Sequence, residues 1–258
     1  MDIKLIECEW EDISNAVENH FVDNNITVDS YWEDHVMNSN HYKIIYEEKL
    51  IGFFAIFNSS FLTLFNMNPE YAKYAQSVFA RIKKYEQVTS AFVSTCDEFL
   101  LSHAVDDFVK LEKQAYFSIY TEKDIEDKKT LLLEPVDGNT DESIFKLAHD
   151  YFDEDIEKIK KGLDYYKLYK VKHENVLIGF GVVEYGRVIK KMASVGMYVV
   201  EEHRQKGYGG NILKTLQSLV EGEGYIARSG CWYYNHNSKK SMEAAGAYSK
   251  TRLLKFFF

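Results

Sequence analysis

Two basic residues and three glycines stand close together late in the chain, at Arg204, Lys206, Gly207, Gly209 and Gly210. An apolar, β-branched run precedes them and predicts a buried strand, and apolar residues at helical spacing follow them. A chain that turns through glycines from a strand into a helix leaves several backbone N–H groups at the positive end of the helix. Because glycine also lets a ligand approach that backbone closely, the stretch predicts a binding site for a phosphate or pyrophosphate.

The spacing of the glycines separates the families that use such a loop. A dinucleotide-binding fold needs a third glycine further on and an acidic residue about 20 positions later, and a P-loop needs a Lys followed by Ser or Thr. Neither pattern is present. The pattern Arg-x-x-Gly-x-Gly, from Arg204 to Gly209, instead resembles the acyl-CoA pyrophosphate loop of the GCN5-related N-acetyltransferase (GNAT) family. For these six residues alone, an ordinary tight turn is the alternative interpretation.

A second stretch extends the resemblance. Family members follow the loop and its helix with a strand, an Asn, a small residue, a further helix and a Gly. Here a predicted strand over 225–234 leads to Asn235, Ser238 and Gly246, at the family's spacing. The chain departs from the pattern at Met242, where many members carry a Tyr thought to protonate the departing CoA thiolate. A thioether cannot donate a proton, so another group must do this or catalysis has been lost.

The resemblance implies transfer of an acetyl or other acyl group from acyl-CoA to an amine, by direct attack in a ternary complex. It implies that backbone groups of Met197, Tyr198 and Val199 bind the pantetheine arm, with Asn235 and Ser238 near it. The residues it assigns to the pyrophosphate loop are Arg204, Gln205, Lys206, Gly207, Tyr208, Gly209 and Gly210.

The attacking amine must lose a proton, so such a site needs a base or a chain of water molecules. Glu184, at the end of a predicted central strand, is the first candidate, although a solvent-facing carboxylate would look the same in the sequence. Cys231 could form a covalent acyl-cysteine, but a buried inert thiol is far more common. The acceptor stays open among polyamines, antibiotics, amino acids and protein amino termini.

Two other classes of function also stay open. A GNAT-like protein that binds acyl-CoA or a partner without turnover would explain Met242. In an unrelated α/β protein, the glycine loop would be a structural turn. Turnover of an amine with acetyl-CoA separates the enzyme from the sensor, and CoA binding separates both from the unrelated fold.

The composition argues against several other functions. The 258 residues, of which 46% are hydrophobic, suffice for one large domain or two smaller ones. A net charge of −9 argues against a nucleic-acid partner and suits a cationic amine. The three cysteines show neither metal-ligand nor disulfide spacing, so we expect no metal and a cytoplasmic protein. The sequence has no apolar run of membrane-spanning length and no signal peptide, so we expect no membrane partner. The protein is expected to be a monomer or a homodimer.

The two halves of the chain repeat one order of predicted elements. The sequence Leu-Ile-Gly-Phe occurs at 50–53 and again at 177–180, an offset of 127 residues. We expect a duplication with its boundary in the charged stretch 122–130, which gives domains 1–126 and 127–258. The fold class predicted is α/β (α+β), with two tandem GNAT-like domains, each a mixed, mainly antiparallel sheet flanked by helices.

The first copy lacks the glycine loop. At the corresponding place it has 66–70, Asn-Met-Asn-Pro-Glu, in which Pro69 removes an N–H group and Glu70 adds negative charge. We therefore expect a degenerate amino-terminal domain. This resembles tandem GNAT proteins in which only the carboxy-terminal domain holds the cofactor.

The expected elements follow from the hydrophobic periodicity. In the first half, they are helices over 12–21, 29–36, 68–82 and 97–109 and strands over 42–46, 50–57, 60–65, 89–95 and 115–120. In the second half, they are a strand from 131, a helix from 141, strands over 166–171, 176–184 and 193–200, the helix after the glycine loop, the strand over 225–234 and a short helix to 245.

Overall fold

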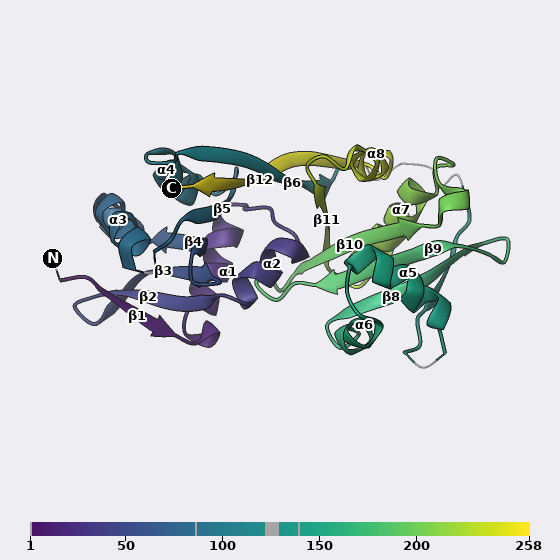
Figure 1. The fold of residues 1–258 in the computed structure, drawn as a ribbon, viewed down its shortest axis with the longest axis horizontal. Coiled ribbons are helices and arrows are strands. Elements are labelled where there is room, and N and C mark those ends of the chain that lie inside the picture. Colours follow the sequence, from purple (N-terminus) through teal and green to yellow (C-terminus); the bar gives the residue numbers. More distant parts are fainter. Residues whose placement is uncertain (1, 86, 122–128, 139) are drawn as a thin grey trace. The chain divides into compact units, whose positions relative to one another are not determined.

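The computed structural model describes residues 2–85, 87–121, 129–138 and 140–258, which form two compact units (Figure 1). Unit 1 consists of Met1–Phe117, Arg187–Lys190 and Thr251–Phe258, and unit 2 consists of Ser118–Gly186 and Lys191–Lys250. The units do not follow chain order, because the end of the chain returns to unit 1. The predicted boundary between residues 126 and 127 lies within 122–128, outside the described residues, and stays a prediction.

Unit 1 contains the first set of expected helices and strands. Asp29 caps the second helix as predicted, because its carboxylate accepts the N–H of Trp32 at 3.2 Å. The elements are β1 (Lys4–Cys8), η1 (Trp10–Asp12), α1 (Ser14–Asp23), α2 (Ser30–Met37), β2 (Asn40–Tyr46), β3 (Lys49–Phe57), β4 (Phe61–Met67), η2 (Pro69–Tyr74), α3 (Ala75–Tyr85), β5 (Ser90–Ser94), α4 (Glu98–Val105) and most of β6 (Lys110–Tyr120).

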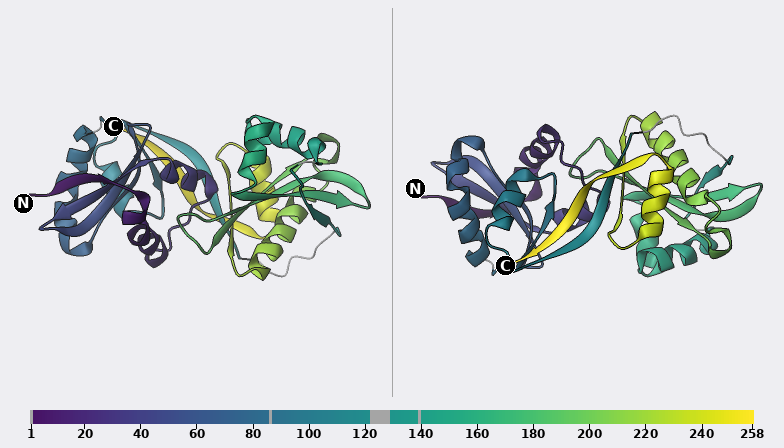
Figure 2. Two further views of the ribbon diagram at one scale, coloured as in Figure 1. Left: turned by 90° about the horizontal axis from the view of Figure 1, so that it is seen from below. Right: turned by 90° about the horizontal axis from the view of Figure 1, so that it is seen from above.

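Unit 2 contains the second set. Its helices α5 and α6 lie on one face of its strands and α7 lies on the other (Figure 2). The elements are β7 (Leu132–Pro135), α5 (Glu142–Phe152), α6 (Ile156–Gly162), β8 (Tyr166–His173), β9 (Val176–Tyr185), β10 (Met192–Val199), η3 (Glu201–His203), α7 (Tyr208–Gly222), β11 (Ile226–Trp232), α8 (His236–Ala244) and the start of β12 (Ala247–Phe257).

The strands form one hydrogen-bonded sheet with the order β1-β2-β3-β4-β5-β12-β6-β11-β10-β9-β8-β7. Hairpin neighbours such as β2 and β3, or β8 and β9, pair antiparallel. The pairs β4–β5 and β10–β11 are parallel. The prediction of a mixed, mainly antiparallel sheet with flanking helices is thus confirmed.

The repeat predicted from Leu-Ile-Gly-Phe has a counterpart in the backbone. The β2–β3 ladder is irregular between Ile44 and Ile45, and the β8–β9 ladder is irregular between Val171 and Lys172, again 127 positions later. At Gly52 an added Cβ would lie 2.4 Å from the carbonyl oxygen of the facing strand, and at Gly179 it would lie 1.9 Å from the corresponding oxygen. Both copies therefore need glycine for the same close strand approach, which supports the duplication.

A buried carboxylate organises the helical side of unit 1. Glu33, on α2, is 1% exposed and accepts the backbone N–H groups of Arg187, Val188 and Ile189 at 2.8–3.2 Å. Burial raises the pKa of Glu33, although the three N–H groups oppose the shift. These contacts fix the Arg187–Lys190 segment within unit 1.

Some element boundaries differ from the predictions. The helix expected over 97–109 ends at Val105, and β6 begins at Lys110, where an exposed, charged start hid the strand pattern. The helix expected from residue 68 opens as the 3-10 segment η2, and the α-helix begins only at Ala75. Strand β1, helix α6 and the last strand β12 were not predicted.

Candidate functional site

The strands β10 and β11 separate partway along their length. Their parallel ladder contains three pairs, from Met192↔Ile226 to Ser194↔Arg228, although both strands continue beyond it. The β9 side of β10 stays paired as far as Val199. Along a strand in an antiparallel ladder, the backbone N–H and C=O groups of successive residues point alternately to one side and to the other. Those of Tyr198 and Val200 point at β9. The backbone groups of Met197 therefore point towards the gap.

Side chains hold the apex of this gap. The Ser229 hydroxyl donates to the carbonyl oxygen of Val195 at 2.7 Å and therefore accepts from the Tyr120 hydroxyl, also at 2.7 Å. Burial raises the pKa of Tyr120, and the hydrogen bond to Ser229 offsets this only in part, so the phenol keeps its proton. A side-chain bond thus replaces the next backbone pair, just where β10 and β11 part.

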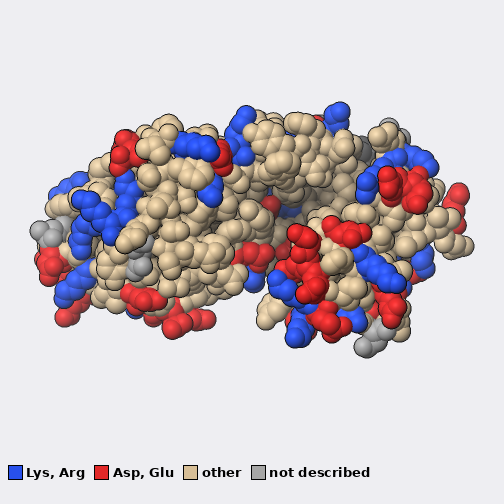
Figure 3. Space-filling model, in the orientation of Figure 1, with Lys and Arg blue, Asp and Glu red and all other residues tan. Residues whose placement is uncertain are grey.

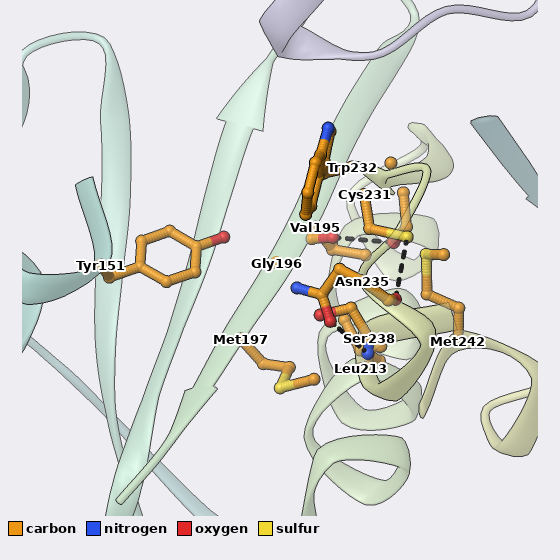
Figure 4. A pocket seen from close by; sticks show the side chains of 12 residues that line it. Tyr151, Val195, Gly196, Met197, Leu213, Cys231, Trp232, Asn235, Ser238 and Met242 are labelled. Atoms are coloured by element: carbon orange, nitrogen blue, oxygen red, sulfur yellow. Dashed lines mark hydrogen bonds between the residues drawn. The ribbon is translucent and has the colours of Figure 1, made fainter. Parts of the chain in front are cut away.

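A pocket of about 190 Å³ occupies the gap (Figure 4). Its residues come from α5, from both parted strands, and from α7 and α8. They are Tyr151, Val195, Gly196, Met197, Leu213, Ser229, Gly230, Cys231, Trp232, Asn235, Ser238 and Met242. Of the predicted site residues, the structure brings Met197, Asn235 and Ser238 together at this pocket.

The glycine loop lies between the same strand β10 and helix α7, as predicted. Gly207 is the N-cap of α7, with φ 82°, and an added Cβ would meet nothing within 4 Å. Gln205, with φ 61°, also takes the left-handed conformation. This 15-residue helix therefore begins at an exposed, open turn. Its first backbone N–H groups have no acceptor within the helix and lie at the positive end of the helix dipole, which favours an anion.

The two basic residues of the loop contact the backbone next to it. The Arg204 Nε donates to the carbonyl oxygen of Val199 at 3.0 Å, and a terminal nitrogen lies 3.3 Å from the Tyr198 hydroxyl. The Lys206 Nζ donates to the carbonyl oxygen of Glu202 at 2.8 Å. Both side chains are exposed, so their remaining N–H groups face solvent at the start of α7.

Two of the three glycines have a packing role that the sequence did not reveal. A Cβ on Gly209 would lie 2.8 Å from the Ser241 Oγ, and one on Gly210 would lie 3.0 Å from the Ala244 Cβ. Both glycines lie inside α7 and face α8. The assignment of Gly207, Gly209 and Gly210 to the pyrophosphate loop stays a prediction: Gly207 shapes the open turn, and Gly209 and Gly210 also let α7 and α8 pack closely.

The second predicted motif builds the start of α8. The Asn235 Oδ1 accepts the N–H of Ser238 at 3.1 Å, so this pair is a helix cap that also lines the pocket. Met242, one helical turn further, is 2% exposed and contributes its thioether to the pocket wall. The position that carries a Tyr in many GNAT proteins is therefore an apolar wall residue here.

The two candidate reactive groups are placed differently. Cys231 lines the pocket, and its Sγ lies 3.8 Å from the carbonyl oxygen of Asn235. Glu184 faces Ser194 across the β9–β10 ladder, two positions from the Val182↔Gly196 pair at the pocket, and it is not one of the lining residues. Its role as general base stays a prediction.

Unit 1 has the same strand separation with a different filling. The β4–β5 ladder contains the pairs Phe61↔Ser90 and Leu62↔Ala91, and both strands then continue. Since Gly52 faces Met67 as Gly179 faces Val199, Phe65 corresponds to Met197. Phe65 is 1% exposed, and its ring packs against Phe79, Phe99 and His103 with centroids 5.2–5.4 Å apart. These rings occupy the place of the unit 2 pocket.

The charges near the pocket are mainly acidic on the side of α5. In Figure 3 acidic side chains gather over the end of α5 and the start of α6. The sequence has Asp150, Asp153, Glu154, Asp155 and Glu157 in these elements, and of these Glu154 pairs with Lys158 and Glu157 with Lys160. Tyr151, which lines the pocket, stands within this run. The basic residues Arg204 and Lys206 instead lie at the glycine loop.

Sequence and structure comparisons agree on the fold. Residues 9–121 match the family model described as an acetyltransferase (GNAT) domain. A GNAT-family acetyltransferase from Colwellia psychrerythraea has a TM-score of 0.87 at 17% identity, with 100% of both chains covered.

Two other structures also match over nearly the full length. A GCN5-related N-acetyltransferase from Sphaerobacter thermophilus has a TM-score of 0.69 at 9% identity, covering 98% of this chain and 94% of its own. A tandem GNAT protein from the clavulanic acid biosynthesis pathway has a TM-score of 0.62 at 10% identity, with 99% and 98% covered.

No curated protein sequence matches the chain significantly. Within the described residues, no helix combines the length and apolar character needed to cross a bilayer. In the same residues, no three His, Cys, Asp or Glu side chains come together as a metal site requires.

Proposed function

The chain has the tandem GNAT fold over its whole length, with an acetyltransferase (GNAT) domain at residues 9–121, and from this premise we propose that unit 2 is an acyl-CoA-dependent N-acyltransferase. The observation that carries the proposal is one continuous feature of unit 2. The strand separation, the pocket within it and the open N-terminus of α7 adjoin one another on β10 and its continuation.

Each part of this feature suits one part of an acyl-CoA. The N–H groups at the start of α7, with Arg204 and Lys206, suit the pyrophosphate. The backbone of Met197, turned away from β9, suits the amide groups of the pantetheine arm. The pocket between the strands suits the thioester and the acyl group. In the described part of unit 1, the segment 66–70 stands in place of the glycine turn, and the rings around Phe65 are packed where unit 2 has its pocket, so we assign the acyl-CoA to unit 2 alone.

The acceptor we propose is an amine that reaches the pocket from the α5 side. The acidic run around Tyr151 would attract a cationic amine and raise its local concentration. The amine must be neutral to attack, so a base or a water chain takes its proton. Glu184 is the proposed base, because it lies on the adjacent strand two positions from the residue that faces Gly196.

The experiment is a turnover assay with the full chain, acetyl-CoA and longer acyl-CoAs, against a panel of polyamines, amino acids, aminoglycosides and peptides. Release of free CoA thiol that depends on the amine, with the acylated amine identified by mass spectrometry, supports the proposal. A protein that binds acyl-CoA but acylates none of these amines instead favours the second candidate, an acyl-CoA-binding protein without turnover. That candidate rests on the apolar Met242 at the wall of the pocket.

A further inference from the structure

Tyr151 reaches the strand separation from the side opposite to α8. It lies at the end of α5, and Figure 4 shows its hydroxyl directed at Gly196, with Asn235 and Met242 on the other side of β10. A Cβ built on Gly196 would lie only 2.9 Å from this hydroxyl oxygen. The phenol therefore reaches the pocket because residue 196 has no side chain.

Neighbouring rings fix the direction of this side chain. The Tyr151 ring meets Phe180 edge-on with centroids 5.4 Å apart, and Tyr198 at 6.4 Å. Phe180 and Tyr198 stack on each other at 5.5 Å. Tyr151 nevertheless remains 41% exposed, so protons can exchange between its hydroxyl and solvent.

The remaining pocket groups are less suited to donate a proton. Those with a dissociable proton are Tyr151, Ser229, Cys231 and Ser238. Ser229 already donates its proton to the Val195 carbonyl. Serine hydroxyls are far weaker acids than phenols. A thiol is a stronger acid than a phenol, so position and not acidity argues against Cys231. Cys231 is directed towards the Asn235 carbonyl on the α8 side.

We infer that Tyr151 is the proton donor to the departing thiolate, a catalytic role that rests on the acyltransfer function proposed above. The amine lone pair forms a bond to the acyl carbon, and the carbon–sulfur bond breaks with its electron pair going to sulfur. The thiolate then takes the phenolic proton of Tyr151. The proton lost by the amine leaves through the base or water, and the phenolate regains a proton from solvent. With Tyr151 as the donor, the reaction needs no proton donor on α8, where Met242 stands at the position of the usual Tyr.

The test compares the full-length wild type with Tyr151→Phe, with Tyr165→Phe as the matched control, because Tyr165 is an exposed tyrosine that does not line the pocket. Removal of one exposed hydroxyl should leave the melting temperature and the acetyl-CoA Kd unchanged. It should lower kcat by at least about 100-fold, the lower end of what general acid catalysis contributes. Tyr165→Phe removes the same hydroxyl away from the pocket and should retain kcat within about threefold of the wild type.

A second donor provides a readout that a structural role would not move. With the oxygen-ester analogue of acetyl-CoA, the leaving group is a far more basic alkoxide. The kcat penalty of Tyr151→Phe should therefore be larger with the ester than with the thioester. Equal penalties, a wild-type kcat for Tyr151→Phe, or a loss confined to KM would overturn the assignment. If the wild type itself acylates no amine, it is the proposed function that fails, and the inference falls with it.

Discussion

Placing a negative charge at the N-cap of α7 tests the glycine loop with little disturbance of the fold. Gly207 and Gly224 flank the two ends of this helix, with φ 82° and 88°, and a Cβ at either position would meet nothing within 4 Å. Gly207→Glu and Gly224→Glu therefore carry the same left-handed strain, about 1–2 kcal/mol each. They differ in which end of α7 receives the carboxylate.

The expected loss of affinity follows from Coulomb's law. A carboxylate about 6 Å from one phosphate charge, at an effective dielectric of about 20, repels it by about 2.8 kcal/mol. This corresponds to roughly a hundredfold weaker binding of acetyl-CoA by Gly207→Glu. Gly224→Glu should bind like the wild type, and high salt should restore part of the lost affinity because this charge is exposed.

The assay is isothermal titration of each variant with acetyl-CoA at low and high salt, after melting curves show equal stability of the two variants. Gly207→Gln, which keeps the strain without the charge, separates the two effects. The reasoning would be refuted if Gly207→Glu and Gly224→Glu bound acetyl-CoA equally well. Gly209→Glu is a poorer probe, because its side chain would collide with Ser241 and disturb α8.

Three further changes test the surrounding fold. Gly210→Val should lower the free energy of unfolding, measured in urea, by about 1–3 kcal/mol, because its Cβ would lie 3.0 Å from the Ala244 Cβ. Gly222→Val is the control, since a Cβ at that position has open space. Equal losses of stability in the two variants would contradict the packing role. The raised pKa of Glu33 means that the folded protein holds this proton more tightly than the unfolded chain does. The stabilising contribution of Glu33 is therefore present below pH 4.5 and is lost as the pH rises through the pKa of the folded state. Over that range, the melting temperature of the wild type should fall relative to that of Glu33→Gln. A constant difference between the two melting temperatures would contradict this. Phe65→Leu should cost about 1–2 kcal/mol in urea unfolding and leave the acetyl-CoA Kd unchanged, and a parallel loss of binding would place the ligand in unit 1.

The sequence sufficed for the fold where the signal was local. Helical and strand periodicity located most elements, and the glycine-rich turn between β10 and α7 was recognisable from spacing alone. The Leu-Ile-Gly-Phe repeat predicted a duplication, and in the structure the two copies share a backbone irregularity and a close strand approach. By contrast, β12 pairs with β5, more than 150 residues away in the chain, and periodicity contains no information on such a partner.

The site was predictable in part. Met197, Asn235 and Ser238 were predicted and line the pocket, while the packing role of Gly209 and Gly210 depends on α8 and could not be read from the loop. Ser229 and Tyr151 were missed, because a serine on a strand and a tyrosine on an amphipathic helix look like ordinary packing residues. A glycine facing the helix, Gly196, was the only local signal for Tyr151.

One acyl-CoA should bind per chain, in unit 2. Calorimetric titration of the full-length protein with acetyl-CoA tests it most directly, with Gly207→Glu and Phe65→Leu measured in parallel. We expect one site per chain, weakened about a hundredfold by Gly207→Glu and unaffected by Phe65→Leu. No binding, two sites per chain, or loss of binding on changing Phe65 would contradict it.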